Sequence, residues 1–382
     1  MKIVIAPDSF KESLSALQVA KHIEAGFRQV YPDAEYVLLP MADGGEGTVD
    51  ALVAACNGRR VEVPVTGPEG TPVAGFYGCL NPGGTAVIEM AAASGLALVP
   101  PERRNPLKST TWGTGELILA ALDAGAHHLI IGLGGSATSD GGAGMLQALG
   151  ARLLDENGRQ VSPGAEGLLQ LASIDLNTLD PRLSDCLIEV ACDVTNPLLG
   201  PQGAAAIFGP QKGASPAMVR QLESALSHYA SVIESQLGIV VRDKPGGGAA
   251  GGMGVALQAL LGGRTRAGVE IVIDAVGLDA AISGANLVVT GEGRIDSQSV
   301  QGKTPIGVAR IARRHRVPVI GIAGSLSPDV ETVYAYGLDA VFSVLIRPCL
   351  LEDALRDAAA NVRLTARNVA ALHRIGACGH FN

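Results

Sequence analysis

The chain has 382 residues and a formal net charge of −8, with 47% hydrophobic, 17% charged and 3% aromatic residues and 50 glycines. This length predicts about two domains, and a glycine-rich, aromatic-poor composition is typical of α/β proteins with buried parallel strands. Because the acidic chain lacks a Lys/Arg run, an apolar segment of roughly 18 residues and a signal peptide, we expect a cytoplasmic protein that binds neither nucleic acid nor membrane.

The N-terminal segments alternate between strand and helix patterns. Residues 2–7, KIVIAP, predict a buried parallel strand, and the helix after it is capped by Ser13 or Ser15. Residues 36–41 predict a second strand, followed by a helix over about 47–56. Parallel sheets bind ligands beyond the carboxyl ends of their strands, so the two strand-to-helix loops supply candidate substrate-binding residues, namely Asp8, Ser9, Lys11, Asp43 and Gly44. A helix-capping aspartate and a solvated lysine explain the first loop equally well.

The middle of the chain has a different pattern. After Gly58, short apolar runs separated by Gly/Pro turns predict an antiparallel meander, and a helix over about 114–124 follows with Thr114 as its N-cap. Residues 127–151 then predict a strand, a glycine-rich loop and a helix. Small residues and hydroxyls in this loop are typical of a nest that binds an anion, and the candidates are Gly134, Gly135, Ser136, Thr138 and Asp140. A tight turn without a ligand is the alternative, since the loop lacks the G-x-G-x-x-G pattern.

A strand over 187–192 ends at Asp193, which has Thr195 and Asn196 as polar neighbours. A carboxylate in this position predicts a ligand for Mg²⁺ or for a sugar hydroxyl. A long helix is expected over about 215–237. The six cysteines have no metal-type spacing and mostly lie in apolar runs, so we expect buried free thiols.

Residues 287–305, LVVTGEGRIDSQSVQGKTP, combine an apolar strand, a polar loop and a helix start at Pro305. The loop carries Arg294, Asp296 and Lys303, and a helix N-terminus offers free N–H groups to a phosphate. We therefore expect this loop to bind a charged oxyanion, with a solvated surface loop as the alternative. It is not a Walker A motif, because that pattern requires a glycine where Ser297 stands.

Strand and helix patterns alternate again to the C-terminus, and the last helix is expected over 351–374. Three strands here and two at the N-terminus predict five parallel strands joined by right-handed crossovers. The predicted fold is α/β: residues 1–61 and 285–382 form a Rossmann-like domain with a parallel sheet, and residues 62–284 form an inserted mixed α/β domain. We expect the active site in the cleft between the two domains.

The chain resembles the bacterial glycerate kinase family from end to end. The resemblance rests on uncommon strings in the expected order, among them KIVIAPDSFKESLSA, MADGGEGTVDAL, GGSATSDGGAGMLQALGA, CDVTNPLLGPQGAA, FGPQKGA, GAAGGMG and TGEGRIDSQSVQGKTPIGVA. It implies a two-domain fold with a Rossmann-like part and transfer of a phosphoryl group from ATP, with Mg²⁺, to D-glycerate. Similar family members form 2-phosphoglycerate.

Phosphoryl transfer needs carboxylates for Mg²⁺ or for the acceptor's proton, and cations for the phosphate and for the carboxylate of glycerate. Asp193 and Asp296 are the first candidates for metal ligand or general base, ahead of Asp8 and Asp43. Lys11, Arg294 and Lys303 are candidates to hold the anionic groups, and the loop at 134–142 is a candidate cradle for phosphate or substrate.

Three alternatives remain from the sequence. In the first, the enzyme forms 3-phosphoglycerate. In the second, it phosphorylates another small hydroxy acid such as tartronate or a short aldonate. In the third, the chain is a non-catalytic sugar-acid sensor. A sensor would need a DNA-binding or partner-binding module, and no helix-turn-helix pattern or basic segment is present. The sequence leaves open whether the protein is a homo-oligomer.

Overall fold

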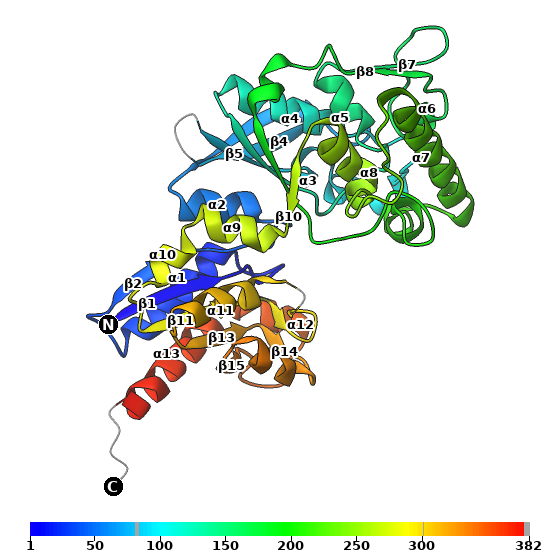
Figure 1. Cartoon of the computed structure of the whole chain (residues 1–382). Coiled ribbons are helices and arrows are strands. Elements are labelled where there is room, and N and C mark those ends of the chain that lie inside the picture. Colours follow the sequence, from blue (N-terminus) through cyan, green and yellow to red (C-terminus); the bar gives the residue numbers. More distant parts are fainter. Residues whose placement is uncertain (81–83, 301, 378–382) are drawn as a thin grey trace. The chain divides into compact units, whose positions relative to one another are not determined.

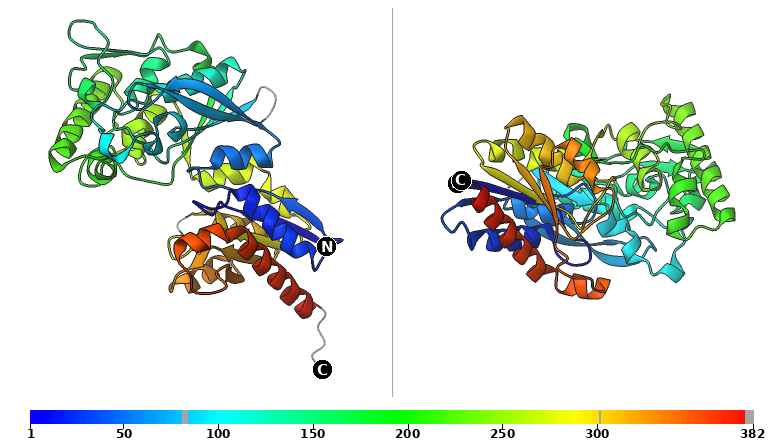
Figure 2. Two further views of the ribbon diagram at one scale, coloured as in Figure 1. Left: turned by 180° about the vertical axis from the view of Figure 1, so that it is seen from behind. Right: turned by 90° about the horizontal axis from the view of Figure 1, so that it is seen from below.

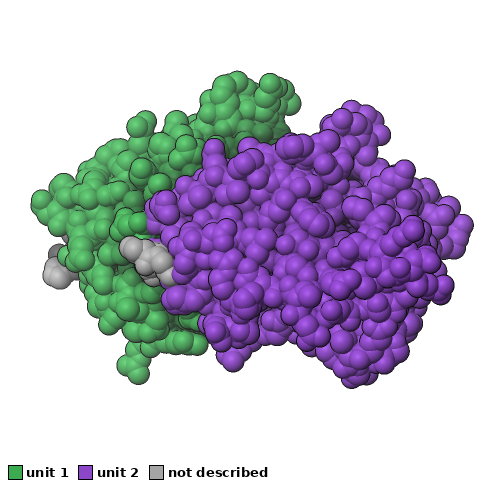
Figure 3. All heavy atoms as spheres, turned by 90° about the horizontal axis from the view of Figure 1, so that it is seen from above, with its two compact units in different colours: residues 1–43, 50–57, 269–382 green, residues 44–49, 58–268 purple. Residues whose placement is uncertain are grey.

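The computed structural model describes residues 1–80, 84–300 and 302–377. It divides into two compact units, which Figure 3 colours separately. Unit 1 contains both ends of the chain and comprises residues 1–43, 50–57 and 269–382. Unit 2 comprises residues 44–49 and 58–268.

Unit 1 is built on a five-stranded sheet in which every pair of neighbouring strands is parallel (Figure 1). This confirms the predicted α/β fold with a parallel sheet formed by both chain ends. The order across the sheet is β15 (Ala340–Ser343), β13 (Val319–Ala323), β11 (Leu287–Gly291), β1 (Lys2–Pro7) and β2 (Glu35–Leu38). A two-stranded parallel pair, β12 (Arg294–Ile295) and β14 (Ser325–Leu326), lies in the same unit.

Helices cover this sheet because its three central strands, β1, β11 and β13, are apolar and buried on both faces. Helix α1 (Ala16–Arg28) begins with a capping box formed by Ser15 and Gln18, and it packs against α13 (Ala358–Ala377) (Figure 2). Ile3 and Ile5 of β1 share a core with Ile23 and Phe27 of α1. Helix α11 (Thr304–Arg314) packs against β11 and against α10 (Leu278–Ile282). The other helices here are α2 (Thr48–Ala55), α9 (Gly268–Ala275) and α12 (Leu351–Arg356), and the boundary between the units falls within α2 and α9.

Three elements of unit 1 differ from the sequence-based expectation. The second strand ends at Leu38, two residues before Pro40, which has no N–H to donate to a sheet. Between β13 and β15, where the alternating pattern predicts a helix, the chain forms a 3₁₀ helix over Val330–Tyr336. The last helix is interrupted at Asp357, whose φ of −91° and ψ of 3° separate α12 from α13.

Unit 2 contains a mixed six-stranded sheet, and the expected antiparallel meander forms one side of it. In order across the sheet the strands are β10 (Arg264–Arg266), β9 (Leu187–Ala191), β6 (His128–Gly132), β5 (Thr85–Glu89), β4 (Pro72–Cys79) and β3 (Arg59–Thr66). The meander consists of β3, β4 and β5. Strands β5, β6, β9 and β10 are parallel to one another. A separate antiparallel pair is formed by β7 (Arg152–Leu154) and β8 (Ser173–Asp175).

The helices of unit 2 surround this sheet: α3 (Ala91–Ser94), α4 (Trp112–Asp123), α5 (Ala143–Ala148), α6 (Ala165–Leu168), α7 (Pro216–Leu237) and α8 (Ala249–Val255). The prediction that Thr114 caps α4 is wrong. The helix starts at Trp112 after the N-cap Thr111, and the Thr114 hydroxyl lies 2.8 Å from the Ser94 hydroxyl inside unit 2. Helices among the described residues are too short or too polar to cross a membrane.

Five cysteines are described, and all are free thiols. The prediction that they are buried is wrong, because Cys56, Cys79, Cys186 and Cys192 are half-buried and Cys349 is exposed. Cys378 lies outside the described residues.

Candidate active site

The strand order of unit 1 contains a topological switch point. From β1 the chain crosses to β2 on one side, whereas from β11 it crosses to β13 and β15 on the other. The switch therefore lies between the neighbouring strands β1 and β11, and in open α/β sheets ligands bind beyond the carboxyl ends of the strands at such a point. Asp8 directly follows β1, and Glu292 directly follows β11. The fold thus places two carboxyl groups where this architecture binds ligands.

Asp8 connects the loop after β1 to the start of α11. Its carboxylate accepts hydrogen bonds from the Ser9 backbone N–H at 2.6 Å and the Ser9 hydroxyl at 3.2 Å, and from the Thr304 hydroxyl at 2.8 Å. Thr304 is the first residue of α11, one position earlier than expected from Pro305. The predicted pair Asp8 and Ser9 therefore lies beside the N-terminus of an 11-residue helix.

Glu292 is the principal residue that the sequence reasoning missed in unit 1. It is only 8% exposed, and its two carboxylate oxygens contact two different residues of the loop before α11. One oxygen accepts a hydrogen bond from the Ser299 hydroxyl, and the other lies 3.9 Å from the Lys303 ammonium group. An acidic residue between two glycines directly after a buried strand is the sequence signal that could have identified it.

Two predicted residues of the same loop form an ion pair. The Asp296 carboxylate lies 3.3 Å from Nε of Arg294 and accepts a hydrogen bond from the Gln298 N–H at 2.9 Å. The Arg294 side chain is largely exposed. Lys11 is also exposed, and its backbone nitrogen would lie 3.6 Å from a Cβ added at Gly293. The exposed cations Lys11 and Arg294 are therefore carried by backbone segments that lie side by side.

Negative charge accumulates at this edge of unit 1, in a group that we call the carboxylate cluster: Asp8, Asp43, Glu292 and Asp296. Burial and then the charge of Asp43 raise the pKa of Asp8 to about 6. Burial is also the main reason that the pKa of Glu292 rises to about 7, with Asp8 and Asp296 adding to the effect while Ser299 and Lys303 oppose it. Burial and the neighbouring carboxylates therefore both disfavour the charged forms of Asp8 and Glu292.

The predicted glycine-rich loop of unit 2 follows β6. Gly134 and Gly135 are exposed, and Gly135 has a φ of +73° that favours glycine. A Cβ added at Gly135 would lie 3.3 Å from Cβ of Ala91, so the loop packs closely on α3. Ser136 is 8% exposed, at the point where the loop turns into the interior of the unit.

The other two predicted residues of this loop lie inside unit 2. Thr138 and Asp140 are completely buried. The Asp140 carboxylate accepts hydrogen bonds from the Thr111 N–H at 2.9 Å and hydroxyl at 2.8 Å, and from the N–H groups of Gly142 and Gly144. In this conformation its oxygens hold the loop together, and a nucleotide cannot reach them.

A buried lysine is the second residue that the sequence reasoning did not assign. Lys212 is 1% exposed, and its ammonium group donates a hydrogen bond to the backbone carbonyl of Thr138. Burial lowers the pKa of Lys212 to about 7, and the nearby Asp140 opposes this shift. The buried hydroxyls of Thr138 and Ser139 have no hydrogen-bond partner within the described part of the protein. The exposed glycines of the loop are therefore followed by buried polar residues that lie close to Lys212.

Two further predicted residues, Gly44 and Asp193, lie near the carboxyl ends of the parallel strands of unit 2. Gly44 has a φ of +89°, and a Cβ there would meet Cβ of Ala191 at 2.9 Å, so this glycine is required for close packing. Asp193 is exposed and accepts a hydrogen bond from the Gly268 N–H at 2.9 Å, at the start of α9. A third acidic residue of unit 2, Glu89 at the end of β5, accepts a hydrogen bond at 2.7 Å from the N–H of Val49 in the first turn of α2.

Over residues 1–80, 84–300 and 302–377, no group of three or more His, Cys, Asp or Glu side chains is arranged to hold a metal ion. Mg²⁺ usually binds through one or two carboxylates together with substrate phosphates, so a complete cage of protein ligands is not required for it.

Comparisons with known proteins agree with the resemblance seen in the sequence. A model of the glycerate kinase family matches residues 3–374. The chain is 58% identical over 376 residues to the glycerate 2-kinase of Escherichia coli K12, covering 98% of this chain and 99% of that protein. It is 59% identical over 371 residues to the glycerate kinase of Bacillus subtilis 168, covering 97% of each chain.

A crystal structure of a candidate glycerate kinase 2 from Salmonella typhimurium LT2 has the same fold. The TM-score is 0.90 at 61% sequence identity, and the match covers 98% of this chain and 99% of the other. Because the family model spans nearly the whole sequence and relatives match at more than half of all positions, the chain belongs to the glycerate kinase family.

Proposed function

We propose that the protein transfers the γ-phosphoryl group of ATP to the 2-hydroxyl group of D-glycerate, forming 2-phosphoglycerate. The observation that carries this proposal is the 58% identity, over 98% of the chain, to a protein named glycerate 2-kinase. The switch point of unit 1 supports it independently, because it combines carboxylates, exposed cations and a helix N-terminus. Phosphoryl transfer requires these groups to bind the metal and to stabilise negative charge.

The start of α11 is our proposed site for the phosphates of ATP. The N–H groups in the first turn of a helix and the helix dipole both attract anions. Lys303 is the N-cap residue of α11 and adds a positive charge there. Its side chain is 36% exposed. Phosphate bound here would lie close to Glu292, which holds Lys303 in place.

The carboxylate cluster is our proposed site for Mg²⁺. Its donor atoms are carboxylate oxygens, which are the ligands that Mg²⁺ prefers, and because burial raises the pKa values of Asp8 and Glu292, a bound cation would stabilise their charged forms. Bound Mg²⁺ would neutralise charge on the phosphates during transfer. We assign Asp296 as the main ligand or proton acceptor in unit 1 and keep Asp193 of unit 2 as the second candidate.

The remaining predicted residues are assigned to glycerate. Arg294 and Lys11 are exposed cations that can bind its carboxylate, and Asp8, Ser9 and Asp43 can accept or donate hydrogen bonds with its hydroxyl groups. In unit 2, the N–H groups around the exposed Gly134 and Gly135, together with Ser136, are proposed to bind an anionic group of the substrate.

A substrate panel tests this function. ADP release is measured with ATP, Mg²⁺ and each of three acceptors: D-glycerate, tartronate and a short aldonate. We expect D-glycerate to have the highest kcat/KM. A higher kcat/KM for another hydroxy acid would replace the proposed substrate, and a folded sample that consumes no ATP with any acceptor would favour the sensor hypothesis.

A further inference from the structure

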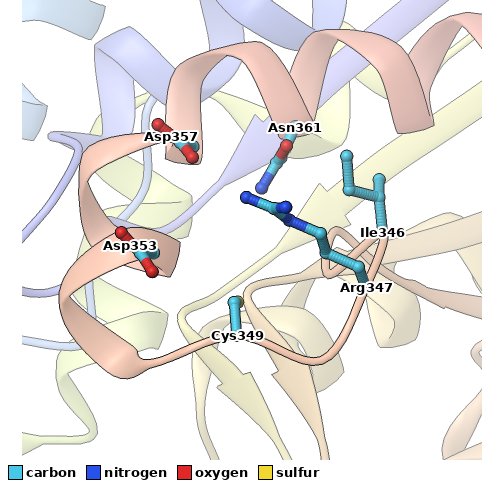
Figure 4. Close-up of a pocket in the computed structure, with 6 residues that line it drawn as sticks. All are labelled: Ile346, Arg347, Cys349, Asp353, Asp357 and Asn361. Carbon is cyan, nitrogen blue, oxygen red and sulfur yellow. The ribbon is translucent and has the colours of Figure 1, made fainter.

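A pocket of about 290 Å³ lies in unit 1, between the loop that follows β15 and the helices α12 and α13 (Figure 4). Ile346, Arg347 and Cys349 line it from the loop, and Asp353, Asp357 and Asn361 line it from the helices. Asp353 belongs to α12, Asp357 lies at the break between the two helices, and Asn361 belongs to the first turn of α13. None of these residues belongs to the predicted site or to the carboxylate cluster.

Asn361 is a largely buried polar residue that lines this pocket. The residue is only 7% exposed, but the polar atoms of its amide are accessible from the pocket and make no hydrogen bond with another described residue. The body of the residue is therefore fixed by packing while its amide faces the pocket, where it can hydrogen-bond to a ligand in place of water. A ligand that both accepts and donates a hydrogen bond would satisfy it.

The pocket lies at the edge of the sheet where the switch point also lies. Its loop begins directly after β15 ends at Ser343, so it stands at the carboxyl ends of the parallel strands, as Asp8 and Glu292 do. Two strands, β13 and β11, separate β15 from β1. Neighbouring strands lie about 4.8 Å apart, so roughly 12 Å separates β15 from the switch point between β11 and β1. A ribose and a chain of phosphates can bridge such a gap.

We propose that this pocket binds the adenosine part of ATP, and that the phosphates extend along the sheet edge to α11 and Lys303. This inference rests on the proposed function, which supplies ATP as the phosphoryl donor. It adds a nucleoside site that neither the motifs nor the relatives' names assign.

The lining residues suit a purine nucleoside. An asparagine amide can pair with the adjacent donor and acceptor on the edge of adenine. Ile346 is 60% exposed and offers an apolar surface, and the planar guanidinium of Arg347 can stack on an aromatic ring. Arg356 pairs with one carboxylate oxygen of Asp353 at 2.7 Å, which leaves the other oxygen available for a ribose hydroxyl.

The first test is the binding of ADP by equilibrium dialysis to the wild type and to two asparagine variants. Asn361→Ala removes the amide that lines the pocket, whereas Asn368→Ala removes an exposed amide elsewhere on the same helix. We expect Kd for ADP to rise about tenfold in Asn361→Ala, which corresponds to one or two lost hydrogen bonds, and to stay unchanged in Asn368→Ala. The KM for D-glycerate should not change. A folded Asn361→Ala protein that binds ADP within twofold of the wild type would overturn the proposal.

The second test uses the wild type alone, so it does not depend on the folding of a variant. Cys349 lines the pocket and is exposed, whereas Cys186 lies in unit 2 and serves as an internal reference. Alkylation of each thiol is followed by mass spectrometry with and without saturating ADP. ADP should slow alkylation of Cys349 several-fold and leave Cys186 unaffected, and D-glycerate alone should protect neither thiol. Equal rates at Cys349 with and without ADP would contradict the proposal.

These tests separate the pocket from the reaction. If the acceptor panel rejects D-glycerate while ADP still protects Cys349 and Asn361→Ala still weakens ADP binding, the proposed substrate fails and the nucleoside site stands. If D-glycerate is phosphorylated but ADP protects nothing in the pocket, the nucleoside site fails and the proposed function stands.

Discussion

Asp296→Asn is expected to lower kcat by at least about 100-fold, within the range usual for the loss of a catalytic acid, base or metal ligand. The variant keeps an oxygen that can accept the hydrogen bond from the Gln298 N–H, so the local backbone should not change. It loses the negative charge that both a metal ligand and a proton acceptor require. Steady-state kinetics with ATP, Mg²⁺ and D-glycerate, together with a thermal unfolding curve, would measure the effect.

The matched control for this variant is Asp33→Asn. Asp33 is an exposed residue of unit 1 before β2, at the opposite edge of the sheet from the switch point, and its replacement should leave kcat unchanged. If Asp296→Asn retained activity within about threefold of the wild type, Asp296 would have to be removed from the proposed catalytic group.

Glu292→Gln is expected to make the protein more stable above pH 7 and much less active. The pKa of Glu292 in the folded protein is about 7, above its usual value of 4.5, so the folded state binds more protons than the unfolded state between these two values. The free energy of unfolding of the wild type therefore falls as the pH rises from about 4.5 to 7 and does not recover above pH 7. Glutamine resembles the protonated form and avoids this loss, which we expect to be about 1–3 kcal/mol.

Thermal unfolding of both proteins at pH 5 and pH 8 would measure this difference. The gain in Tm should be clear at pH 8 and small at pH 5, and it should be absent at both pH values in Glu352→Gln, which changes an exposed glutamate of α12. If the Glu292→Gln protein unfolded at a lower temperature than the wild type at pH 8, the charged carboxylate of Glu292 would not destabilise the folded protein, and the prediction would be wrong.

The sequence predicted the sheet of unit 1 well because its strands are short apolar runs followed by polar loops. That pattern placed Asp8 after the first strand and Lys303 just before a helix, and the structure places them there. The switch point itself depends on the order of the strands across the sheet. Strand order is set by packing between segments almost 300 residues apart, so the pairing of β1 with β11 was available from the structure alone.

Burial was the property that the sequence predicted least well. A glycine loop rich in hydroxyls has the same pattern whether its residues face solvent or the interior, so Thr138 and Asp140 were grouped with the exposed Gly134 and Gly135. Lys212 was not assigned for the related reason that a single lysine gives no local sign of burial. Asn361 is an ordinary polar residue of a long helix, and only the packing around it shows that the residue is buried and that it lines a pocket.

The most direct test of the central claim is a coupled assay of the product of ATP, Mg²⁺ and D-glycerate with enolase as the only coupling enzyme. Enolase acts on 2-phosphoglycerate, so our account predicts phosphoenolpyruvate without added phosphoglycerate mutase. Phosphoenolpyruvate that forms only when the mutase is present would mean that the 3-phosphate is made, which contradicts the proposed position of transfer. If no product forms with or without the mutase in a folded sample, the kinase assignment itself is wrong.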